Sequence, residues 1–321
     1  WGFRGGGIDY FTHKFVGKSD LWDNDSPVSK PGYLTDLLAD RTIETIRAGA
    51  GSERPFFISL HFSAPHWPWE GPDDAAEAKR LDGRTDRAAL FDYDGGSMRK
   101  FGAIVRRMDW QIGRILEELD RLGLSDDTII VFTSDNGGER YSDTWPFTGK
   151  KTELLEGGLR IPAIIRWPRR IAAGQISEQV MISMDWLPTL LACAGTKPDP
   201  AYPSDGIDLS PGFVAGTSLT GRTLCWRYLN LSQEACRDGD LKYLKILDNE
   251  FLFDVVEDPL ERANLKERRP DDFERLRRAW AHWNSQMLPL DPEAFTSGYT
   301  GGHLADHFGI TNSRTVSLPK E

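Results

Sequence analysis

An acid and an amide stand side by side near the middle of this chain, where an apolar run meets two glycines. Asp135 and Asn136 follow residues 128–132, a short β-branched run that predicts a strand buried on both faces of a parallel sheet. In open α/β sheets, ligands bind beyond the carboxyl ends of the strands. Carboxylate and amide oxygens are the hard ligands that Ca²⁺ or Mg²⁺ prefers, so the pair is a candidate metal site. Gly137 and Gly138 allow a sharp turn, and taken alone the tetrad is equally a turn.

Two other segments carry residue types that bind anions or move protons. Residues 55–69 (PFFISLHFSAPHWPW) predict a strand followed by a turn that holds His66 between prolines, whereas His61 falls within the strand as a packed histidine. Residues 149–162 (GKKTELLEGGLRIP) place a lysine pair before a glycine-rich turn. A histidine on such a turn is often a structural hydrogen bonder, and a lysine pair is often a solvated face.

In order and spacing, these segments resemble the sulfatase family of the alkaline-phosphatase superfamily. The family patterns are an apolar strand with a Pro-His-x-Pro turn, then Ser-Asp-Asn-Gly, then a lysine five residues before Glu-Gly-Gly-x-Arg-x-Pro. The resemblance continues through residues 205–209, 241–245 and 252–265, so it covers nearly the whole chain.

The resemblance implies a role for each candidate residue. Asp135 and Asn136 are expected to bind Ca²⁺, with Mg²⁺ as the alternative, although a calcium site takes roughly 6–8 oxygens and is incomplete here. His66 and Lys151 are the expected catalytic and substrate-binding residues: His66 contacts the sulfate and protonates the leaving oxygen. The five-residue spacing selects Lys151 over Lys150. A cation about 4 Å from a sulfate oxygen contributes about 4 kcal/mol at an effective dielectric near 20.

The family's nucleophile pattern does not occur in this sequence. Sulfatases carry a Cys-x-Pro-x-Arg or Ser-x-Pro-x-Arg signature whose first residue becomes formylglycine, after an Asp-Asp pair and before a Gly-Lys-x-His motif. None of Cys193, Cys225 and Cys236 has a proline two positions later. We therefore expect a fragment without its N-terminal part, with formylglycine in the missing segment and no activity in the chain as it stands.

The expected activity is a sulfuric ester hydrolase, a sulfatase that cleaves an alkyl or aryl sulfate monoester of a small molecule or carbohydrate. Two alternatives stay open: a phosphoester or phosphonate hydrolase of the same superfamily, and a non-catalytic anion-binding homologue. A formylglycine signature upstream would favour the sulfatase, and an ordinary Thr or Ser there would favour the phosphatase. Trp67, Trp69, Glu70, Arg140 and Tyr141 flank the motifs and are candidates for the leaving-group pocket, whereas residues 156–160 are expected to be structural, with Arg160 paired to a carboxylate.

Composition and charge limit the kinds of partner that we expect for this chain. Apolar residues make up 39% and charged residues 27% of the 321 residues, and no apolar run reaches the roughly 20 residues of a membrane span. A net charge of −10 argues against a nucleic-acid partner, whose phosphates would be repelled. Three scattered cysteines do not decide the compartment. Localisation and oligomeric state are not fixed by the sequence, although a signal peptide in a missing N-terminus would make the protein periplasmic or secreted.

Helix and strand patterns alternate along the chain, which predicts an alkaline-phosphatase-like α/β fold with a mostly parallel sheet flanked by helices. Apolar spacing predicts a helix over residues 101–122, and an N-cap at Thr35 with an acidic first turn predicts one over residues 36–46. A further helix is expected over residues 185–194, before Gly195, and a buried strand over residues 161–165.

A stretch rich in Pro, Gly, Ser and Thr at residues 198–221 predicts a domain boundary. We expect a truncated catalytic domain over residues 1–215 and a smaller α+β subdomain over residues 216–321. The subdomain is expected to contain a hairpin from 241–247 and 251–255, a helix over 271–287, and an irregular tail.

Overall fold

The computed structural model describes residues 1–84, 92, 95–216 and 221–291. The chain divides into two compact units, Trp1–Thr128 and Ile129–Glu321. The boundary predicted near residue 215 lies inside the second unit and stays a prediction, and the predicted tail falls on residues 292–321, outside the described residues. Within the described ranges, no helix has both the length and the apolarity that crossing a membrane needs.

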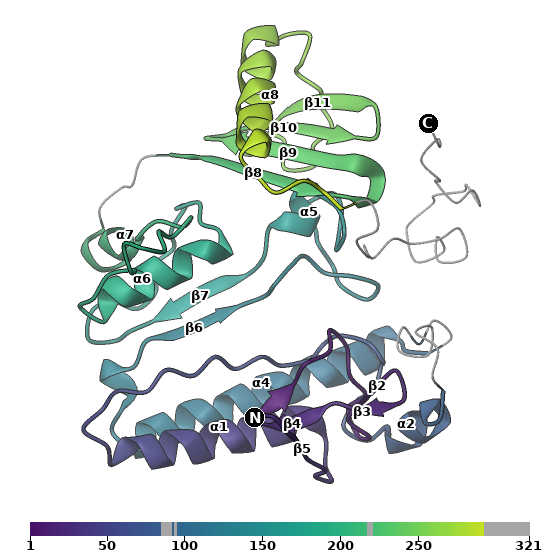
Figure 1. The fold of residues 1–321 in the computed structure, drawn as a ribbon, viewed down its shortest axis with the longest axis vertical. Coiled ribbons are helices and arrows are strands. Elements are labelled where there is room, and N and C mark those ends of the chain that lie inside the picture. The colour runs from purple at the N-terminus through teal and green to yellow at the C-terminus, as the bar shows by residue number, and fades with distance from the viewer. Residues whose placement is uncertain (85–91, 93–94, 217–220, 292–321) are drawn as a thin grey trace. The chain divides into compact units, whose positions relative to one another are not determined.

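Two long helices, α1 (Leu34–Ala50) and α4 (Met98–Arg121), lie side by side in the first unit (Figure 1). Arg107 of α4 holds Asp36 of α1 through two hydrogen bonds, of 2.7 and 2.5 Å. These helices confirm the two predicted over residues 36–46 and 101–122. The remaining elements of this unit are β1 (Gly2–Phe3), β2 (Lys14–Phe15), β3 (Lys18–Ser19), β4 (Leu21–Asp23), β5 (Ser26–Pro27), α2 (Ala75–Leu81) and the short 3₁₀ helix η1 (Ser125–Asp127). Strands β1, β4 and β5 form one antiparallel sheet, and β2 pairs with β3.

The strand predicted over residues 55–62 is not formed. Among the described residues this segment pairs with no strand, and its side chains alternate between exposed and half-buried, with Phe57 80% exposed. His61 is exposed and contacts Ser59 through a 2.8 Å hydrogen bond, so its prediction as a packed histidine was wrong. An apolar run gives a segment its strand propensity, but a strand also needs a neighbour whose backbone completes the ladder.

The second unit begins with β6 (Ile130–Thr133), which pairs with β7 (Ala163–Arg166) in antiparallel register. This corrects the parallel pairing predicted here. Parallel neighbours need a crossover connection, whereas residues 134–162 fold back on themselves and contain only the short helix α5 (Glu156–Leu159). Neither strand is fully buried, and Ile164 is 61% exposed, so burial on both faces was also wrong.

A four-stranded antiparallel sheet in the order β11-β10-β9-β8 forms the C-terminal part of the second unit (Figure 1). Its strands are β8 (Thr223–Tyr228), β9 (Gln233–Asp238), β10 (Leu241–Ile246) and β11 (Asn249–Asp254). Strands β10 and β11 confirm the predicted hairpin, and α8 (Pro270–Ser285) confirms the predicted helix. Helix α8 packs on one face of the sheet, where Leu276 joins Cys236, Tyr243 and Leu252 in one apolar cluster.

Shorter helices follow β7 in the sequence. The predicted helix over 185–194 is confirmed as α6 (Trp186–Cys193), and it ends before Gly195, whose φ is +75°. The others are η2 (Ser183–Asp185), α7 (Ser210–Ala215) and η3 (Asn230–Ser232).

Candidate functional site

Asp135 and Asn136 lie in the loop directly after β6, as the sequence predicts. Asp135 is exposed. The side-chain nitrogen of Asn136 donates to the carbonyl of Gly137 at 3.0 Å, and the hydroxyl of Ser134 donates to the carbonyl of Asn136 at 3.2 Å. Because the bond to Gly137 engages the amide nitrogen of Asn136, the amide oxygen of Asn136 is the atom that can act as a ligand.

Glycines join this loop to the Glu-Gly-Gly turn by direct backbone contact. The Gly137 amide donates to the Gly158 carbonyl at 2.9 Å. A Cβ on Gly137 would stand 1.9 Å from the carbonyl oxygen of Gly157, and a Cβ on Gly157 would stand 2.2 Å from that of Gly149. A Cβ on Gly158 would meet the carbonyl oxygen of Glu153 at 2.1 Å. No side chain fits at these three positions, so the sequence needs glycine there. We call residues 134–160 the docked loops.

Lys151 belongs to the same docked loops. Its backbone amide donates to the Gly138 carbonyl at 2.9 Å, which ties it to the loop that carries Asp135 and Asn136. The backbone amide of the neighbouring Lys150 donates instead to the carboxylate of Glu153 at 3.1 Å. The structure thus brings three of the four predicted site residues into one loop cluster. His66 belongs to the first unit, and its meeting with the other three stays a prediction.

A buried ion cluster holds the docked loops against the C-terminal sheet. The ammonium of Lys242 on β10 lies 2.9 Å from Glu156 and 2.8 Å from Glu261, and the Glu156 amide donates to the Glu261 carboxylate at 2.6 Å. The side chains of Lys242 and Glu261 are fully buried, and that of Glu156 is 3% exposed. Burial raises the pKa of Glu261, and the charge of Lys242 opposes this rise.

Uncharged contacts reinforce the same attachment. The side chain of Gln233 on β9 accepts from the Leu154 amide at 2.8 Å and donates to the Thr152 carbonyl at 2.9 Å. The hydroxyl of Thr148 donates to the Leu260 carbonyl at 2.6 Å. Leu154 itself packs into the apolar cluster formed by Ala235, Leu244, Phe253 and Val255. The sheet therefore fixes the loops by packing as well as by charge.

The residues of this attachment were missed by sequence reasoning. Lys242 lies in a segment quoted for its family resemblance, and a lysine between Leu241 and Tyr243 in an apolar strand was the only signal of a buried charge. The carboxylate partner expected for Arg160 is present, since its guanidinium lies 3.6 Å from Glu156. The structural role expected for residues 156–160 agrees with these contacts.

His66 lies on a turn that two backbone contacts hold. Its amide donates to the Ser63 carbonyl at 2.8 Å, and the hydroxyl of Tyr10 donates to the His66 carbonyl at 2.9 Å. The ring atom Nδ1 lies 3.0 Å from the Trp67 carbonyl. A carbonyl can only accept, so Nδ1 carries a proton. Nε2 is then the ring nitrogen that can gain or lose a proton without breaking this bond.

Glu70 anchors the far side of the same turn from a fully buried position. Its carboxylate accepts from the Tyr10 amide at 3.0 Å, and its carbonyl accepts from the Tyr33 hydroxyl at 2.8 Å. Burial and the neighbouring Asp9 charge raise the pKa of Glu70 to about 9. Glu70 is therefore a neutral acid at pH 7.

Two of the residues proposed for a leaving-group pocket are packing residues. Trp69 is 2% exposed and Glu70 is 0% exposed, so neither lines a surface, and their prediction was wrong. A tryptophan beside a proline pattern does not distinguish a pocket wall from a core position. Trp67, Arg140 and Tyr141 are half-buried, and their role stays a prediction.

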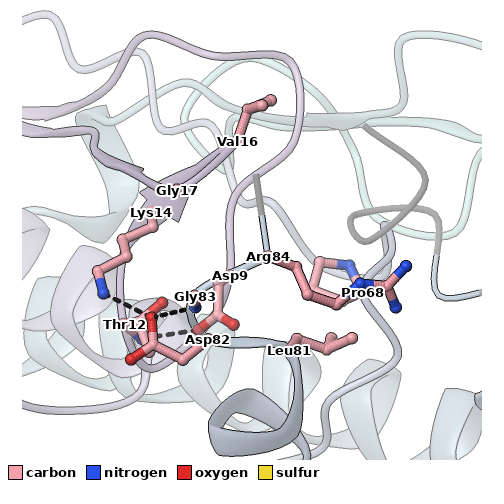
Figure 2. Close-up of a pocket in the computed structure, with 10 residues that line it drawn as sticks. All are labelled: Asp9, Thr12, Lys14, Val16, Gly17, Pro68, Leu81, Asp82, Gly83 and Arg84. Atoms are coloured by element: carbon pink, nitrogen blue, oxygen red, sulfur yellow. Dashed lines mark hydrogen bonds and ion pairs between the residues drawn. The ribbon is translucent and has the colours of Figure 1, made fainter. Parts of the chain in front are cut away.

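A small pocket lies near the second proline of this turn, Pro68 (Figure 2). Its wall includes Asp9, Lys14 and Asp82, and the Lys14 ammonium lies 2.5 Å from the Asp82 carboxylate. The Lys14 hydrogen bond lowers the pKa of Asp82. The lysine and this aspartate neutralise each other, and we assign the pocket no role.

The donor set of the docked loops fits part of a calcium site. Asp135 and Asn136 offer two hard oxygens, the chemistry that Ca²⁺ prefers. Among the described residues, no group of three or more His, Cys, Asp or Glu side chains is arranged to hold a metal. The two oxygens are fewer than the roughly 6–8 that a full site requires.

A family model and individual relatives all match this chain to sulfatases. The family model described as Sulfatase matches residues 2–196. The N-acetylgalactosamine-6-sulfatase of Rattus norvegicus is 35% identical over 190 residues, which are 57% of this chain and 33% of that protein. The steryl-sulfatase of Mus musculus is 31% identical over 217 residues, 64% of this chain and 32% of that protein. The matched region thus spans about a third of the length of these curated relatives.

Solved structures share the fold. The crystal structure of Ps i-CgsB in complex with k-i-k-neocarrahexaose matches with a TM-score of 0.77 at 24% identity, over 96% of this chain and 71% of that one. The phosphonate monoester hydrolase SpPMH from Silicibacter pomeroyi matches with a TM-score of 0.59 at 19% identity, over 88% of this chain and 67% of that one. These likenesses confirm the predicted α/β fold class.

Proposed function

Because this chain belongs to the sulfatase family, we propose that it is part of an enzyme that hydrolyses a sulfate monoester of a small molecule or carbohydrate. Sulfatases generally use Ca²⁺ and a formylglycine residue. The two relatives described above are named for an amino-sugar sulfate and a steryl sulfate, so their names do not narrow the substrate of this chain further.

Each site residue has a distinct task in this proposal. Asp135 and Asn136 hold Ca²⁺, which when bound supplies positive charge against the sulfate oxygens. Lys151 adds a second positive charge on the same anion, and this charge stabilises the transition state more as negative charge builds up. His66, with Nδ1 engaged by Trp67, delivers the Nε2 proton to the departing alcohol oxygen.

One observation carries the proposal beyond family membership. The backbone contacts among Gly137, Gly157 and Gly158 bring the Asp-Asn loop and the lysine loop into a single cluster. In this proposal the metal and Lys151 contact the same anion, so they must lie within a few ångströms of each other. Asn136 and Lys151 are 15 residues apart in the sequence, and they can do this only if their loops are fixed to each other. The cluster supports such an arrangement.

The chain as it stands is proposed to lack turnover. None of its three cysteines has a proline two positions later, so the family's nucleophile pattern is absent from this sequence. The residues present stabilise charge and move a proton, but they include no candidate for the attacking group. Formylglycine supplies that group in the family.

A phosphonate or phosphate ester hydrolase is the second candidate, because the chain shares its fold with a phosphonate monoester hydrolase. The test is hydrolysis of matched aryl esters by a protein that joins this chain to a Cys-x-Pro-x-Arg segment. We expect release of the phenol from the aryl sulfate, and none by the chain alone. Hydrolysis of the aryl phosphonate but not the sulfate would overturn the sulfatase proposal in favour of the second candidate.

A further inference from the structure

Two cysteines face each other across neighbouring strands of the C-terminal sheet. Cys225 on β8 is the register partner of Cys236 on β9, and their sulfur atoms are 2.9 Å apart. Both are present as thiols. The third cysteine, Cys193, lies on α6 and is half-buried.

The register of the strands matches what a disulfide requires. Residues directly opposite on antiparallel strands have Cα atoms about 4.5–5.5 Å apart and side chains on the same face. A disulfide accepts Cα separations of about 4.4–6.8 Å. We propose that Cys225 and Cys236 form a reversible cross-strand disulfide when the protein meets a small-molecule disulfide such as oxidised glutathione.

Packing holds both thiols in this arrangement. Cys236 is completely buried in the apolar cluster beneath α8, together with Tyr243 and Leu252, and Cys225 packs against the same cluster from a half-buried position. The Trp280 side chain of α8 donates to the Trp226 carbonyl at 2.9 Å, next to Cys225. The strands and the helix thus leave the sulfur atoms little freedom to separate.

The two cysteines have different parts in the reaction. Cys225 is the more accessible thiol, and its hydrogen bond with Cys236 lowers its pKa. The same contact and burial raise the pKa of Cys236. The Cys225 thiolate therefore makes the first attack on the external disulfide, since the thiolate is the nucleophile.

The exchange proceeds in two displacements. First, Cys225 forms a bond to one sulfur of the external disulfide, whose S–S bond breaks to release one thiolate. Second, Cys236 loses its proton to solvent and its sulfur attacks the Cys225 sulfur, which expels the second thiolate. The protein loses two electrons and two protons, and the external disulfide is reduced to two thiols.

The bond would strengthen the sheet that anchors the docked loops. Strand β8 is at one edge of the sheet and β9 carries Gln233, which holds the backbone of Leu154. While it is present, a covalent link between the two strands constrains the unfolded chain and holds the edge strand to its neighbour. Oxidation is therefore expected to raise the unfolding temperature by several degrees.

Oxidised glutathione added to the full, reduced chain provides the test. Intact mass under non-reducing conditions should show loss of two hydrogen atoms, and digestion should give one cross-linked peptide pair joining Cys225 to Cys236. The unfolding temperature should rise, and a reducing agent should reverse both changes. Free thiols at both positions after oxidation, or a stable glutathione adduct at Cys225, would overturn the inference.

Single serine variants provide the matched controls. Cys193→Ser should form the same cross-link with the same shift in unfolding temperature. Cys225→Ser should form no intramolecular link and should show no shift. A cross-link that requires Cys193 would assign the reaction to a different pair and would contradict the proposal.

Discussion

The ammonium of Lys242 lies 2.9 Å from the carboxylate of Glu156, and the lysine side chain has no exposed surface. Lys242 is on a strand of the C-terminal sheet, and Glu156 opens the glycine turn that docks on the Asp-Asn loop. Glu261 shares the same ammonium at 2.8 Å. A charge in the sheet thus positions a loop whose own residues are predicted to bind metal and sulfate.

Lys242→Met is expected to destabilise the protein by about 3–5 kcal/mol, because it removes the ammonium that holds the buried Glu261 and leaves Glu156 with only the more distant guanidiniums of Arg160 and Arg237, each at 3.6 Å. Without the Lys242 charge the pKa of the buried Glu261 rises further and its protonation relieves the defect, so the loss should be larger near pH 8 than near pH 5. Urea unfolding at both pH values measures the loss in the free energy of unfolding. Lys245→Met is the matched control: Lys245 pairs with Glu234 on the same sheet but is 29% exposed, and its pair should contribute about 0–1 kcal/mol. Equal losses in the two variants would refute the role of burial.

Gly137→Ala is expected to destabilise the second unit by about 1–3 kcal/mol or more, because the new Cβ would meet a carbonyl oxygen at 1.9 Å. Thermal unfolding measures the effect. Gly113→Ala is the control, since a Cβ at this position in α4 would meet nothing within 4 Å. That variant should be neutral or more stable by up to about 1 kcal/mol. A neutral Gly137→Ala would mean that the docked loops are not in contact as described.

The pH dependence of stability should reflect Glu70. Its folded pKa of about 9 exceeds the ordinary value of 4.5, so the folded protein holds a proton that the unfolded chain has lost between these values. The stabilising contribution is full below pH 4.5 and falls as pH rises toward 9, by at most about 1.4 kcal/mol per pH unit.

Glu70→Gln should flatten this dependence. A glutamine amide oxygen can accept from the Tyr10 amide as the acid does, and the amide does not titrate. Unfolding measured across that pH range in both proteins should therefore give a shallower fall in stability for the variant. Identical slopes would show that Glu70 is ionised in the folded state.

Adjacent lysines should differ in catalysis. In a protein that supplies the formylglycine segment, Lys151→Ala should reduce kcat for an aryl sulfate by about 10²–10³-fold, the size expected when one charge-stabilising contact is lost. Lys150→Ala keeps the backbone bond to Glu153 and should change kcat little. Steady-state kinetics of the two variants decide the assignment, and a larger loss for Lys150→Ala would reverse it.

Periodic helices and a local hairpin could be predicted from sequence because their signals are local. The apolar spacing from Phe101 to Leu119 defines one face of α4, and Asp248-Asn249 lies at the turn between β10 and β11. The pairing of β6 with β7 could not be predicted, since an apolar run does not name its partner. The same holds for residues 55–62, which have strand propensity but pair with no strand among the described residues.

The candidate site was predicted only where motif spacing carried the information. Asp135, Asn136 and Lys151 fall in one loop cluster, but their attachment depends on Lys242 and Gln233, about 80 residues or more further along the chain. Cysteines that looked scattered in sequence become register partners once β8 and β9 pair. Such contacts depend on tertiary structure, and no local pattern reveals them.

The most direct test of the shared site is a crystal structure of the protein with Ca²⁺ and sulfate bound. Metal–oxygen bonds of about 2.4 Å, the width of a sulfate, and a hydrogen bond of about 2.9 Å together limit the distances among the functional atoms. We predict that the Asp135 carboxylate, the Asn136 amide oxygen, His66 Nε2 and Lys151 Nζ lie within roughly 10 Å of one another around one sulfate. A structure with His66 or Lys151 on the opposite face of the sheet from Asp135 would contradict the account.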